Sequence, residues 1–389
     1  MVKWKFDNQP SAKEEYYSTR GRANLLRQAL NSPNPIQEFA SEELKKTLDL
    51  CLSCKGCKSE CPANVDMARF KAEFLHHYHN KKGIGFKTRL IRHYALILSL
   101  GAKFPRITNR LAKNPWLKKR LQVERQLPSL STQSLKSWWK QHSTKNRAKR
   151  QVILLCDIFT QYHEPQIAQA AIQFLEHNGY AIIPIFLTDS PRFLISQGLL
   201  KQAKKALGDI IEHCYDLVKS GISLIGLEPS ELLTLRDEAI DLVEANQRDK
   251  MRSLSENAKL FEEFILQEIS VGNIDTSDFK IKKQALILHV HCHQKSLVGI
   301  DTSIQALKQL PGTTVTALQT GCCGMSGAFG YEHYDISMKI GEMQLFPAIR
   351  QAPDNALIVA TGTSCRHQIA DGVATTALHP AQIFWNHVN

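Results

Sequence analysis

Four cysteines near the N-terminus are spaced for chemistry at a metal. Cys51, Cys54, Cys57 and Cys61 follow one another within a short run, and Pro62 comes directly after them. The C-x2-C-x2-C-x3-C-P spacing suits a four-iron–four-sulfur (4Fe-4S) cluster, because short gaps curl the backbone until each thiolate reaches a different iron. Structural zinc, the alternative, usually pairs two distant C-x2-C halves. The run therefore predicts a 4Fe-4S cluster and one-electron chemistry.

A second group of metal-ligating residue types lies in the last quarter of the chain. Its members follow three strand-like segments, and they are Cys292, Cys322, Cys323, Cys365, His291 and His293. His289, His291 and His293 flank Cys292, and in a strand these alternate positions would share one face. The group is a candidate second metal site, with buried small hydrophobic residues as the alternative interpretation. Cys156 and Cys214 fit the role of core thiols better.

The positive charge of the chain is concentrated in one segment. There are 49 Lys and Arg against 37 Asp and Glu, a net charge of +12. Residues 81–120 hold twelve Lys or Arg and no Asp or Glu, which equals the whole excess. Such a block predicts an acidic protein partner or an anionic membrane surface, with a solvated helical face as the alternative. Nucleic acid is the least favoured partner, because few aromatic side chains are available to stack on bases.

The N-terminus and the hydropathy favour a cytoplasmic protein. Residues 1–18 are polar and charged, without the apolar core of a secretory signal. The most apolar stretch of the first half, 94–102, is too short to span a bilayer. Clustered cysteines in such a chain favour metal ligation over disulfides. Peripheral contact with the inner face of the membrane is one role that the basic segment allows.

Periodicity divides the chain into zones. Helical patterns cover 20–30, 41–50 and 68–78, with Ser41 as an N-cap. The basic zone is interrupted at Pro105, Pro115 and Pro128, and 133–150 has the composition of a polar linker. Strand-like runs follow at 152–155, 181–186, 223–227, 285–290, 313–318 and 356–360. Helix-like runs lie between them at 166–177, 199–207, 230–245, 302–310 and 336–350. This alternation predicts an α/β region with mostly parallel strands.

The α/β region shows the pattern of a duplication. Strands of its first half lead to Cys156, 188–190 and 228–230. Strands of its second half lead to 291–293, 321–324 and 363–365. The three landmarks recur in the same order, and open α/β sheets bind ligands just past the carboxyl ends of their strands. We therefore expect two half-domains, with the metal ligands on the second.

These motifs resemble those of a known group of enzymes. The run ending at Pro62, the Gly-Cys-Cys-Gly motif at 321–324 and Ser-Cys-Arg at 364–366 resemble the iron–sulfur portion of FAD-linked D-2-hydroxy-acid dehydrogenases. That group oxidises D-lactate, glycolate and D-2-hydroxyglutarate. The cysteine-rich part is also similar to the heterodisulfide reductase B subunit and the anaerobic glycerol-3-phosphate dehydrogenase C subunit. Further similar stretches are 18–24, 60–66, 226–230 and 321–332, so the resemblance extends from about residue 18 to 379.

The resemblance implies an α+β fold with three parts. Residues 1–80 would form an N-terminal α-helical ferredoxin-like domain with one 4Fe-4S cluster. Residues 81–150 would form a basic helical connector. Residues 151–389 would form a duplicated α/β cysteine-rich (CCG) domain with mostly parallel strands and halves at about 151–280 and 281–389.

The resemblance also implies a partner. In fused relatives a flavin domain precedes this region, whereas this sequence has no Gly-rich dinucleotide loop between a strand and a helix. The expected protein is an iron–sulfur subunit or fragment that receives electrons from a FAD-binding dehydrogenase and passes them to a quinone or another acceptor. The resemblance identifies no catalytic residue on this chain. Lys55 and Lys58, beside the first cysteines, are expected to raise the potential of the cluster.

Three departures from the relatives matter. Gln9–Pro10 stands where they usually carry a Cys-Pro pair, so one ligand of a second ferredoxin cluster is missing. Gln368 stands where a fifth cysteine of the second site would be, and 189–190 has lost paired cysteines. The second site would then hold iron, zinc or a non-cubane cluster through mixed ligands. The rival functions are a heterodisulfide-reductase-like thiol–disulfide redox subunit and a metal-stabilised scaffold or nucleic-acid binder.

Overall fold

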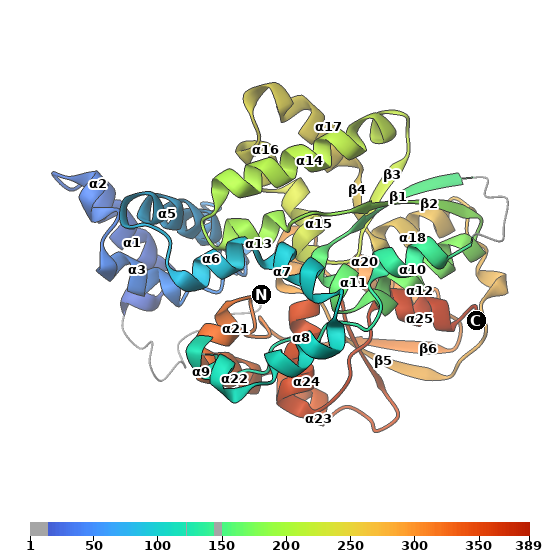
Figure 1. The fold of residues 1–389 in the computed structure, drawn as a ribbon. Helices are drawn as coiled ribbons and strands as arrows, with labels where there is room; N and C mark the ends of the chain where they lie inside the picture. The colour runs from blue at the N-terminus through green and yellow to red at the C-terminus, as the bar shows by residue number, and fades with distance from the viewer. Residues whose placement is uncertain (1–14, 122, 144–149) are drawn as a thin grey trace.

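The computed structural model describes residues 15–121, 123–143 and 150–389, so Gln9–Pro10 lies outside the described residues. Helices form the first part of the chain, and parallel strands alternate with helices in the second (Figure 1). The helices before the first strand are α1 (Thr19–Leu30), α2 (Pro35–Glu38), α3 (Glu42–Asp49), α4 (Gly56–Glu60), α5 (Met67–Lys82), α6 (Phe86–Arg92), α7 (Tyr94–Gly101), α8 (Pro105–Ala112), α9 (Pro115–Leu121) and α10 (Leu135–Gln141).

The strands form two parallel sheets with corresponding strand orders. The first sheet has the order β2-β1-β3-β4, made of β1 (Arg150–Cys156), β2 (Tyr180–Phe186), β3 (Ser223–Gly226) and β4 (Ala258–Leu260). The second has the order β6-β5-β7, made of β5 (Gln284–His289), β6 (Thr313–Ala317) and β7 (Leu357–Ala360). An isolated parallel bridge joins Val359 of β7 to Leu378, on the side where β4 flanks β3 in the first sheet.

Helices connect successive strands, as parallel pairing requires. In the region of the first sheet they are α11 (Ile158–Tyr162), α12 (Pro165–His177), α13 (Pro191–Ser196), α14 (Leu200–Lys219), α15 (Pro229–Arg236), α16 (Ala239–Leu242), α17 (Arg248–Asn257) and α18 (Phe261–Ser270). In the region of the second sheet they are α19 (Cys292–Leu297), α20 (Asp301–Lys308), α21 (Phe329–Glu332), α22 (Tyr334–Met343), α23 (Leu345–Arg350), α24 (Thr363–Val373) and α25 (Pro380–Asn386). The expected mixture of helices and parallel strands is thus confirmed.

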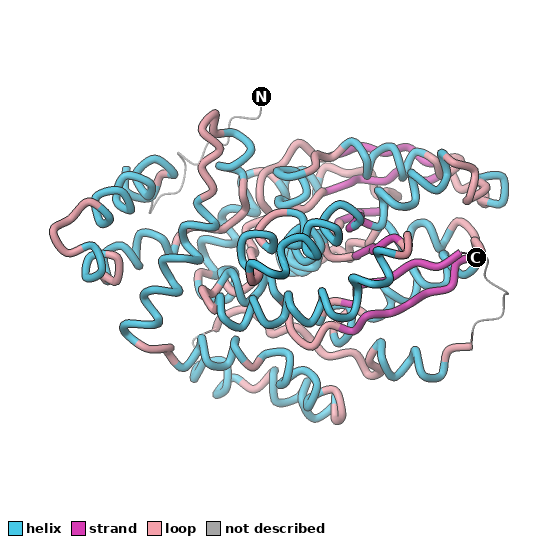
Figure 2. The backbone as a smooth tube through the Cα atoms, turned by 90° about the horizontal axis from the view of Figure 1, so that it is seen from above, coloured by secondary structure: helices cyan, strands magenta, loops and turns pink. Residues whose placement is uncertain are grey.

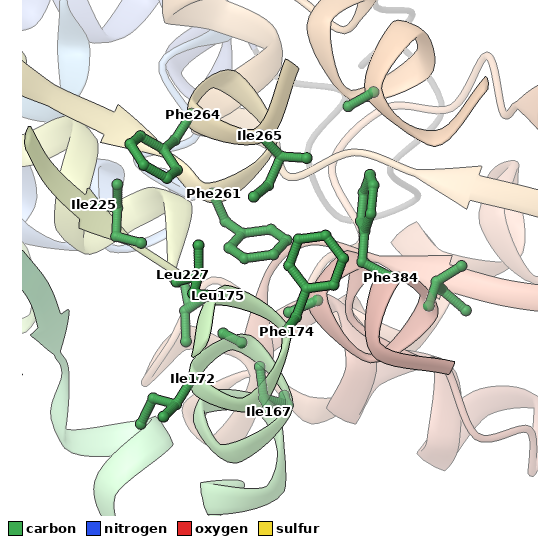
Figure 3. Packing of buried hydrophobic residues seen from close by; sticks show 14 of the residues in the cluster. Ile167, Ile172, Phe174, Leu175, Ile225, Leu227, Phe261, Phe264, Ile265 and Phe384 are labelled. Carbon is green, nitrogen blue, oxygen red and sulfur yellow. The ribbon is translucent and has the colours of Figure 1, made fainter. Parts of the chain in front are cut away.

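The largest hydrophobic core lies between the two sheets. Residues of α12, α18, α20 and α25 pack there against strands of both sheets. Phe174, Phe261 and Phe384 face one another in this layer (Figure 3), and the ring centroids of Phe174 and Phe384 are 5.3 Å apart. Because one continuous core contacts both sheets, we expect the two sheets to unfold together.

The outer faces of the sheets are covered as well. In β1, Val152 and Leu154 face the inter-sheet core, whereas Ile153 and Leu155 pack with residues of α14, α15 and α17. Residues of α23 and α24 cover the other face of the second sheet. Figure 2 shows the strands gathered toward one end of the molecule and helices alone at the other. Burial on both faces is what all-parallel sheets require, and it leaves the strand ends free for chemistry.

The N-terminal helices contact the carboxyl-end side of the sheets. Helix α4 contacts α19, and α5 contacts α13 and α14. Gly198, after α13, has a φ of +66°, and a Cβ there would lie 2.4 Å from Cβ of Leu75 in α5. Glycine is therefore needed at this contact, because it alone combines a left-handed backbone with so close an approach.

Several local predictions are confirmed and several are wrong. The six expected strands are present, and the Ser41 side chain caps α3 by accepting from the backbone N–H of Leu44. The three-residue strand β4 was not expected, because so short a run carries no periodic signal. The basic zone is broken at Pro105 and Pro115 as expected: α7 and α8 end before these prolines, and α8 and α9 begin at them, since proline fits the first helical position.

Two long helices of the prediction are broken. The single helix expected over 230–245 is divided at Asp237 into α15 and α16, and the one over 336–350 is divided at Gln344 into α22 and α23. The expected polar linker over 133–150 contains α10, whose Leu135 is fully buried in the inter-sheet core. Residues 144–149 of that stretch lie outside the described residues.

Candidate metal centre

The first four cysteines lie on a tightly wound loop, residues 51–61, which we call the cluster loop. It leaves α3 after Leu50 and contains the short helix α4. Ser53 and Lys55 adopt left-handed backbone angles, with φ of 50° and 61°. Such angles cost energy in residues other than glycine and persist where the surroundings enforce them, often at functional sites.

Three of the four thiols of this loop influence one another. Burial, together with the neighbouring thiols Cys292, Cys51 and Cys57, raises the pKa of Cys54. Burial also raises the pKa of Cys57, although the backbone N–H of Met67 donates to its Sγ at 3.4 Å and opposes that rise. An amide directed at a ligand sulfur is the contact that tunes an iron–sulfur centre. Cys61 ends α4, where its N–H donates to the Cys57 carbonyl at 3.0 Å.

The cluster loop stands on a buried ion network. Nζ of Lys55, a residue with 1% of its surface exposed, lies 2.9 Å from Oδ2 of Asp66, 2.7 Å from Oδ2 of Asp237 and 2.7 Å from Oε1 of Glu238. Burial would lower the pKa of Lys55, but Glu238 and the other carboxylates raise it, so the ammonium stays charged. Because three carboxylates surround Lys55, we no longer expect it to act on the cluster as an uncompensated positive charge.

Further cations complete the network at its edge. Lys58 pairs with Asp237, and Arg192 lies 2.6 Å from Glu238. Burial alone would raise the pKa of Asp237, but Lys55 and Lys58 hold it well below its usual range. The network joins the cluster loop to the turn between α15 and α16, which accounts for the helix break at Asp237.

The second group of cysteines also comes together. Cys292 begins α19, Cys322 and Cys323 follow β6, and Cys365 lies in the first turn of α24. The Cys322 thiol and burial raise the pKa of Cys292. The pKa values of Cys323 and Cys365, whose thiols contact each other, are also raised. The thiols therefore form a continuous row in the order of the sequence. Binding of a metal there would replace their protons.

Glycine is required for steric reasons at the position after the paired cysteines. Gly324 has a φ of +94°, and a Cβ at this position would lie 2.5 Å from the carbonyl oxygen of Ser337. The turn that carries Cys322 and Cys323 can therefore form only with glycine at its end.

The histidines occupy different places from those expected. His289 is the last residue of β5, and His291 and His293 lie beyond the strand at the start of α19, so strand alternation does not apply to them. Nε2 of His291 lies 4.0 Å from Sγ of Cys292. His293 turns toward the other site, where its Nε2 donates to the Ser53 carbonyl at 2.8 Å. His291 therefore remains beside the second group, and His293 supports the cluster loop.

The two cysteine groups are in contact. Cys54 packs with Cys292 and Cys322 in one apolar cluster that also contains Leu52 and Phe329. Two hydroxyls of the second group's loops donate to carbonyls of the cluster loop: Ser326 to Leu52, and Ser296 to Cys54, the latter at 3.4 Å. Sequence analysis did not predict this contact, because the groups are more than two hundred residues apart and no local pattern links them.

In each group the cysteines lie near one another, but they are not arranged around a single metal ion. Within the described residues, no three His, Cys, Asp or Glu side chains converge closely enough to bind one metal ion. The thiolates of a 4Fe-4S cluster each bind a different iron and stand further apart than the ligands of one ion. The curled loop, the thiol-directed amide and the apolar surroundings of Cys54 fit such a cluster.

The strand ends of the first sheet carry oxygen-bearing groups instead of thiols. Burial raises the pKa of Asp157 to about 6 and that of Glu231 to about 8, and Ser190 donates to Glu231. Glu228 accepts from the backbone N–H of Thr363 at 2.8 Å. Ser190 and Glu228 line one cavity of about 70 Å³ together with Cys292, Cys322 and Cys323. Sequence analysis noted 188–190 and 228–230 as landmarks but did not predict a buried acidic cluster.

The two cysteines that were assigned to the core lie there. Cys156 and Cys214 are fully buried, in the inter-sheet core and under the outer helices of the first sheet, respectively. Gln368, at the place of a fifth cysteine, is buried and accepts from Nη2 of Arg125 at 2.7 Å. It therefore has a packing role in this structure.

Comparisons with known proteins agree with this geometry. A family model described as a 4Fe-4S dicluster domain matches residues 11–66, which include the whole cluster loop. D-2-hydroxyglutarate dehydrogenase of Pantoea ananatis is 26% identical over 362 residues, which cover 88% of this chain and 34% of that protein. The anaerobic glycerol-3-phosphate dehydrogenase C subunit of Escherichia coli is 24% identical, over 66% of this chain and 64% of that protein. The glycolate oxidase iron-sulfur subunit of Escherichia coli is 21% identical, over 95% and 88%.

These similarities confirm the expected resemblance and the iron–sulfur cofactor. They support an electron-transfer role for the chain, which spans about a third of the length of the D-2-hydroxyglutarate dehydrogenases that it matches. Among the described residues, no helix combines the length and the apolar character that a bilayer crossing needs.

Proposed function

We propose that this chain, an iron–sulfur electron-transfer protein, works with a FAD-binding 2-hydroxy-acid dehydrogenase and passes its electrons to a quinone or another acceptor. The observation that carries the proposal is the contact between Cys54 of the cluster loop and Cys292 and Cys322 of the second group. Two sulfur-rich sites in contact provide a short path for electrons. The similarity to the glycolate oxidase iron-sulfur subunit and to the anaerobic glycerol-3-phosphate dehydrogenase C subunit supports a flavoprotein as the donor.

Cys51, Cys54, Cys57 and Cys61 are proposed as the ligands of the 4Fe-4S cluster. A cluster held there would take electrons from a two-electron flavin one at a time. The chain's own contribution is to hold the thiolates on a strained loop, to direct the Met67 N–H at Cys57, and to pack apolar side chains against Cys54. The buried carboxylates around Lys55 fix the loop and limit the local positive charge.

Cys292, Cys322, Cys323 and Cys365, with His291 beside them, are proposed as the second metal site. Its metal would be iron, zinc or a non-cubane cluster, with fewer cysteines than in relatives because Gln368 serves in packing. The corresponding strand orders support 151–389 as a duplicated unit whose halves divide at about residue 280. The boundaries at about residues 80 and 150 are proposed with it. The basic segment 81–120 is the proposed place for docking to the flavoprotein or to an anionic membrane.

A thiol–disulfide redox function is the second candidate. It is favoured by the row of four neighbouring thiols, three of which, Cys292, Cys322 and Cys323, line a cavity. Metal at this row would argue for the relay, whereas metal-free thiols that oxidise reversibly would argue for the disulfide function.

The test of the proposed function is the visible spectrum of protein purified without oxygen. We expect a brown protein whose absorbance bleaches on reduction, and we expect Cys54→Ala to remove most of that absorbance. Cys214→Ala is the matched control, because this thiol is buried far from either group in the outer core of the first sheet. An unchanged spectrum in Cys54→Ala, or a colourless native protein that contains zinc, would contradict the proposal.

A further inference from the structure

Helix α8 is oriented with its polar side toward the protein. The Asn109 side chain donates to the Leu130 carbonyl at 2.8 Å and accepts from the Leu130 N–H at 2.7 Å. Oγ1 of Thr108 donates to the carbonyl of Gly101 at 3.1 Å. An amphipathic helix on a water-soluble surface normally has the opposite orientation, with its apolar side inward. These hydrogen bonds fix α8 with its apolar side outward.

The outward side of α8 is strongly apolar. Ile107 and Leu111, four residues apart, lie on one face of α8, and Phe104 is the residue that precedes the helix. Phe104, Ile107 and Leu111 are 65%, 61% and 56% exposed. Arg106 and Arg110, one turn apart, form an exposed basic row beside them.

The neighbouring helices extend the same surface. In α7, Ala95 and Leu98 face inward, whereas Leu96, Ile97 and Leu100 are exposed. In α9, Trp116 is 71% exposed and is followed by basic residues. Of the large hydrophobic side chains that are exposed in the described part of the chain, most lie between residues 86 and 116. In Figure 1 these helices follow one another in the central and lower part of the view.

The cations of this segment lack carboxylate partners. None of the twelve Lys and Arg of residues 81–120 lies within ion-pairing distance of any described Asp or Glu. The segment itself contains no acidic residue. A surface of exposed apolar groups among unpaired cations is complementary to anionic headgroups above an apolar layer.

The surface is also held in place. Oη of Tyr94 in α7 forms a hydrogen bond with His163 at 3.0 Å. After α9, the buried Arg125 lies 2.6 Å from Asp371 of α24 and donates to the Gly330 carbonyl at 3.1 Å. The helices are therefore fixed to the body at both ends, and little ordering would be needed on binding.

We propose that α7, α8 and α9 form a membrane-binding surface, which we call the lipid face, for a bilayer that contains anionic lipids. Phe104, Ile107, Leu111 and Trp116 would enter the boundary between headgroups and acyl chains, while the Lys and Arg contact lipid phosphates. A bilayer fits better than a protein partner, because the apolar groups are dispersed among unpaired cations over three helices. The inference deepens the docking role proposed for the basic segment and rests on that part of the proposed function.

The test is flotation of the full chain with lipid vesicles. We expect binding to an equimolar mixture of phosphatidylcholine and phosphatidylglycerol, weak binding to phosphatidylcholine alone, and a decrease as salt is added. Substitution of both Phe104→Ser and Ile107→Ser should lower the vesicle-bound fraction by about tenfold or more. The matched control is Val271→Ser with Ile281→Ser, two side chains that are 60% and 78% exposed outside the lipid face.

A charge variant separates the two contributions. Arg106→Gln with Arg110→Gln should weaken binding to the anionic vesicles and leave weak binding to the neutral ones unchanged. Lys201→Gln with Lys205→Gln, on α14, is the control and should have no effect. Iron and acid-labile sulfide are measured in every preparation, so that loss of the cluster is distinguished from loss of lipid binding.

Three results would overturn the lipid face. One is a native protein with full iron and sulfide content that does not float with anionic vesicles. Another is a Phe104 and Ile107 double variant that binds them as the native protein does. The third is a double variant that no longer co-purifies with its flavoprotein while neither form binds vesicles, which would make this surface a protein interface.

Discussion

Just past their carboxyl ends, the strands of the first sheet lead to carboxylates and hydroxyls, where those of the second lead to thiols. Cys156, the last residue of β1, is buried in the inter-sheet core instead. Both sheets place their first strand at the centre, with the second and third strands on either side. The parallel topology therefore brings three loops together in each, and the residue types on those loops decide the chemistry. Asp157 and Glu231 suit proton-carrying oxygen chemistry, whereas Cys292 and Cys322 suit a metal.

The cluster loop touches both sides through two adjacent residues. Cys54 packs with the thiols that follow strands of the second sheet. Lys55 forms ion pairs with the carboxylates between α15 and α16, beside the first sheet. One short loop thus contacts both halves of the α/β region: its Cys54 thiol lies against the second cysteine group, and its Lys55 ammonium lies against the carboxylates of the first half.

The largest expected effect concerns the thiol side. Substitution of both Cys322→Ala and Cys365→Ala should abolish metal binding at the second site and leave the cluster loop's iron and sulfide in place. Elemental analysis with sulfide determination measures both. Cys156→Ala is the matched control, because this thiol ends the equivalent central strand of the first sheet and should change neither count. Equal metal content in the double variant and the native protein would show that Cys322 and Cys365 bind no metal.

The next effect concerns the ion network. Lys55→Met would leave Asp66, Asp237 and Glu238 without their shared cation, and loss of one partner from a buried ion network costs about 3–5 kcal/mol. Urea unfolding followed by circular dichroism measures the change. Lys58→Met is the control and should cost less, since the Lys58 side chain is 20% exposed. Equal costs would show that Lys55 has no special structural part.

The smallest expected effect is a pH dependence on the acidic side. The folded pKa of Glu231, about 8, lies above its ordinary value of 4.5, so its neutral form stabilises the fold below about pH 4.5 and that contribution is lost as the pH rises toward 8. Glu231→Gln should flatten the loss of stability between pH 5 and 8, by about 2 kcal/mol. Asp237 has the opposite sign: its pKa is lowered, so its contribution is present above its ordinary 3.8 and is lost in acid.

Thermal unfolding at pH 5 and pH 8 measures this difference. Glu212→Gln, on the exposed side of α14, is the control. If the Glu231→Gln protein lost as much stability with rising pH as the native protein, ionisation of Glu231 would not be the cause of that loss.

Local sequence patterns predicted much of this molecule. The six longer strands, the Ser41 cap and the two cysteine groups could be located because each depends on residues that are close in the sequence. The contact between the two groups could not be predicted in this way. Lys55 and Asp237 are also far apart in the chain, and only the folded structure shows that the lysine between Cys54 and Cys57 is a buried ion-pair partner.

The lipid face shows a different limit. The periodicity of α8 reveals an apolar side but not whether that side faces the core or the outside. The choice is made by Asn109, whose amide bonds to Leu130 turn the polar side inward. The strand placement considered for His291 and His293 is wrong for a related reason, because β5 ends at His289 and the chain turns into α19.

The most direct test of the central claim is electron paramagnetic resonance of the full chain, purified without oxygen and then reduced. The account predicts the signal of a 4Fe-4S cluster that has taken up one electron, together with acid-labile sulfide, and loss of that signal in Cys51→Ala. A reduced protein that shows no such signal and contains no acid-labile sulfide would contradict the account, because the cluster loop would then carry no electrons.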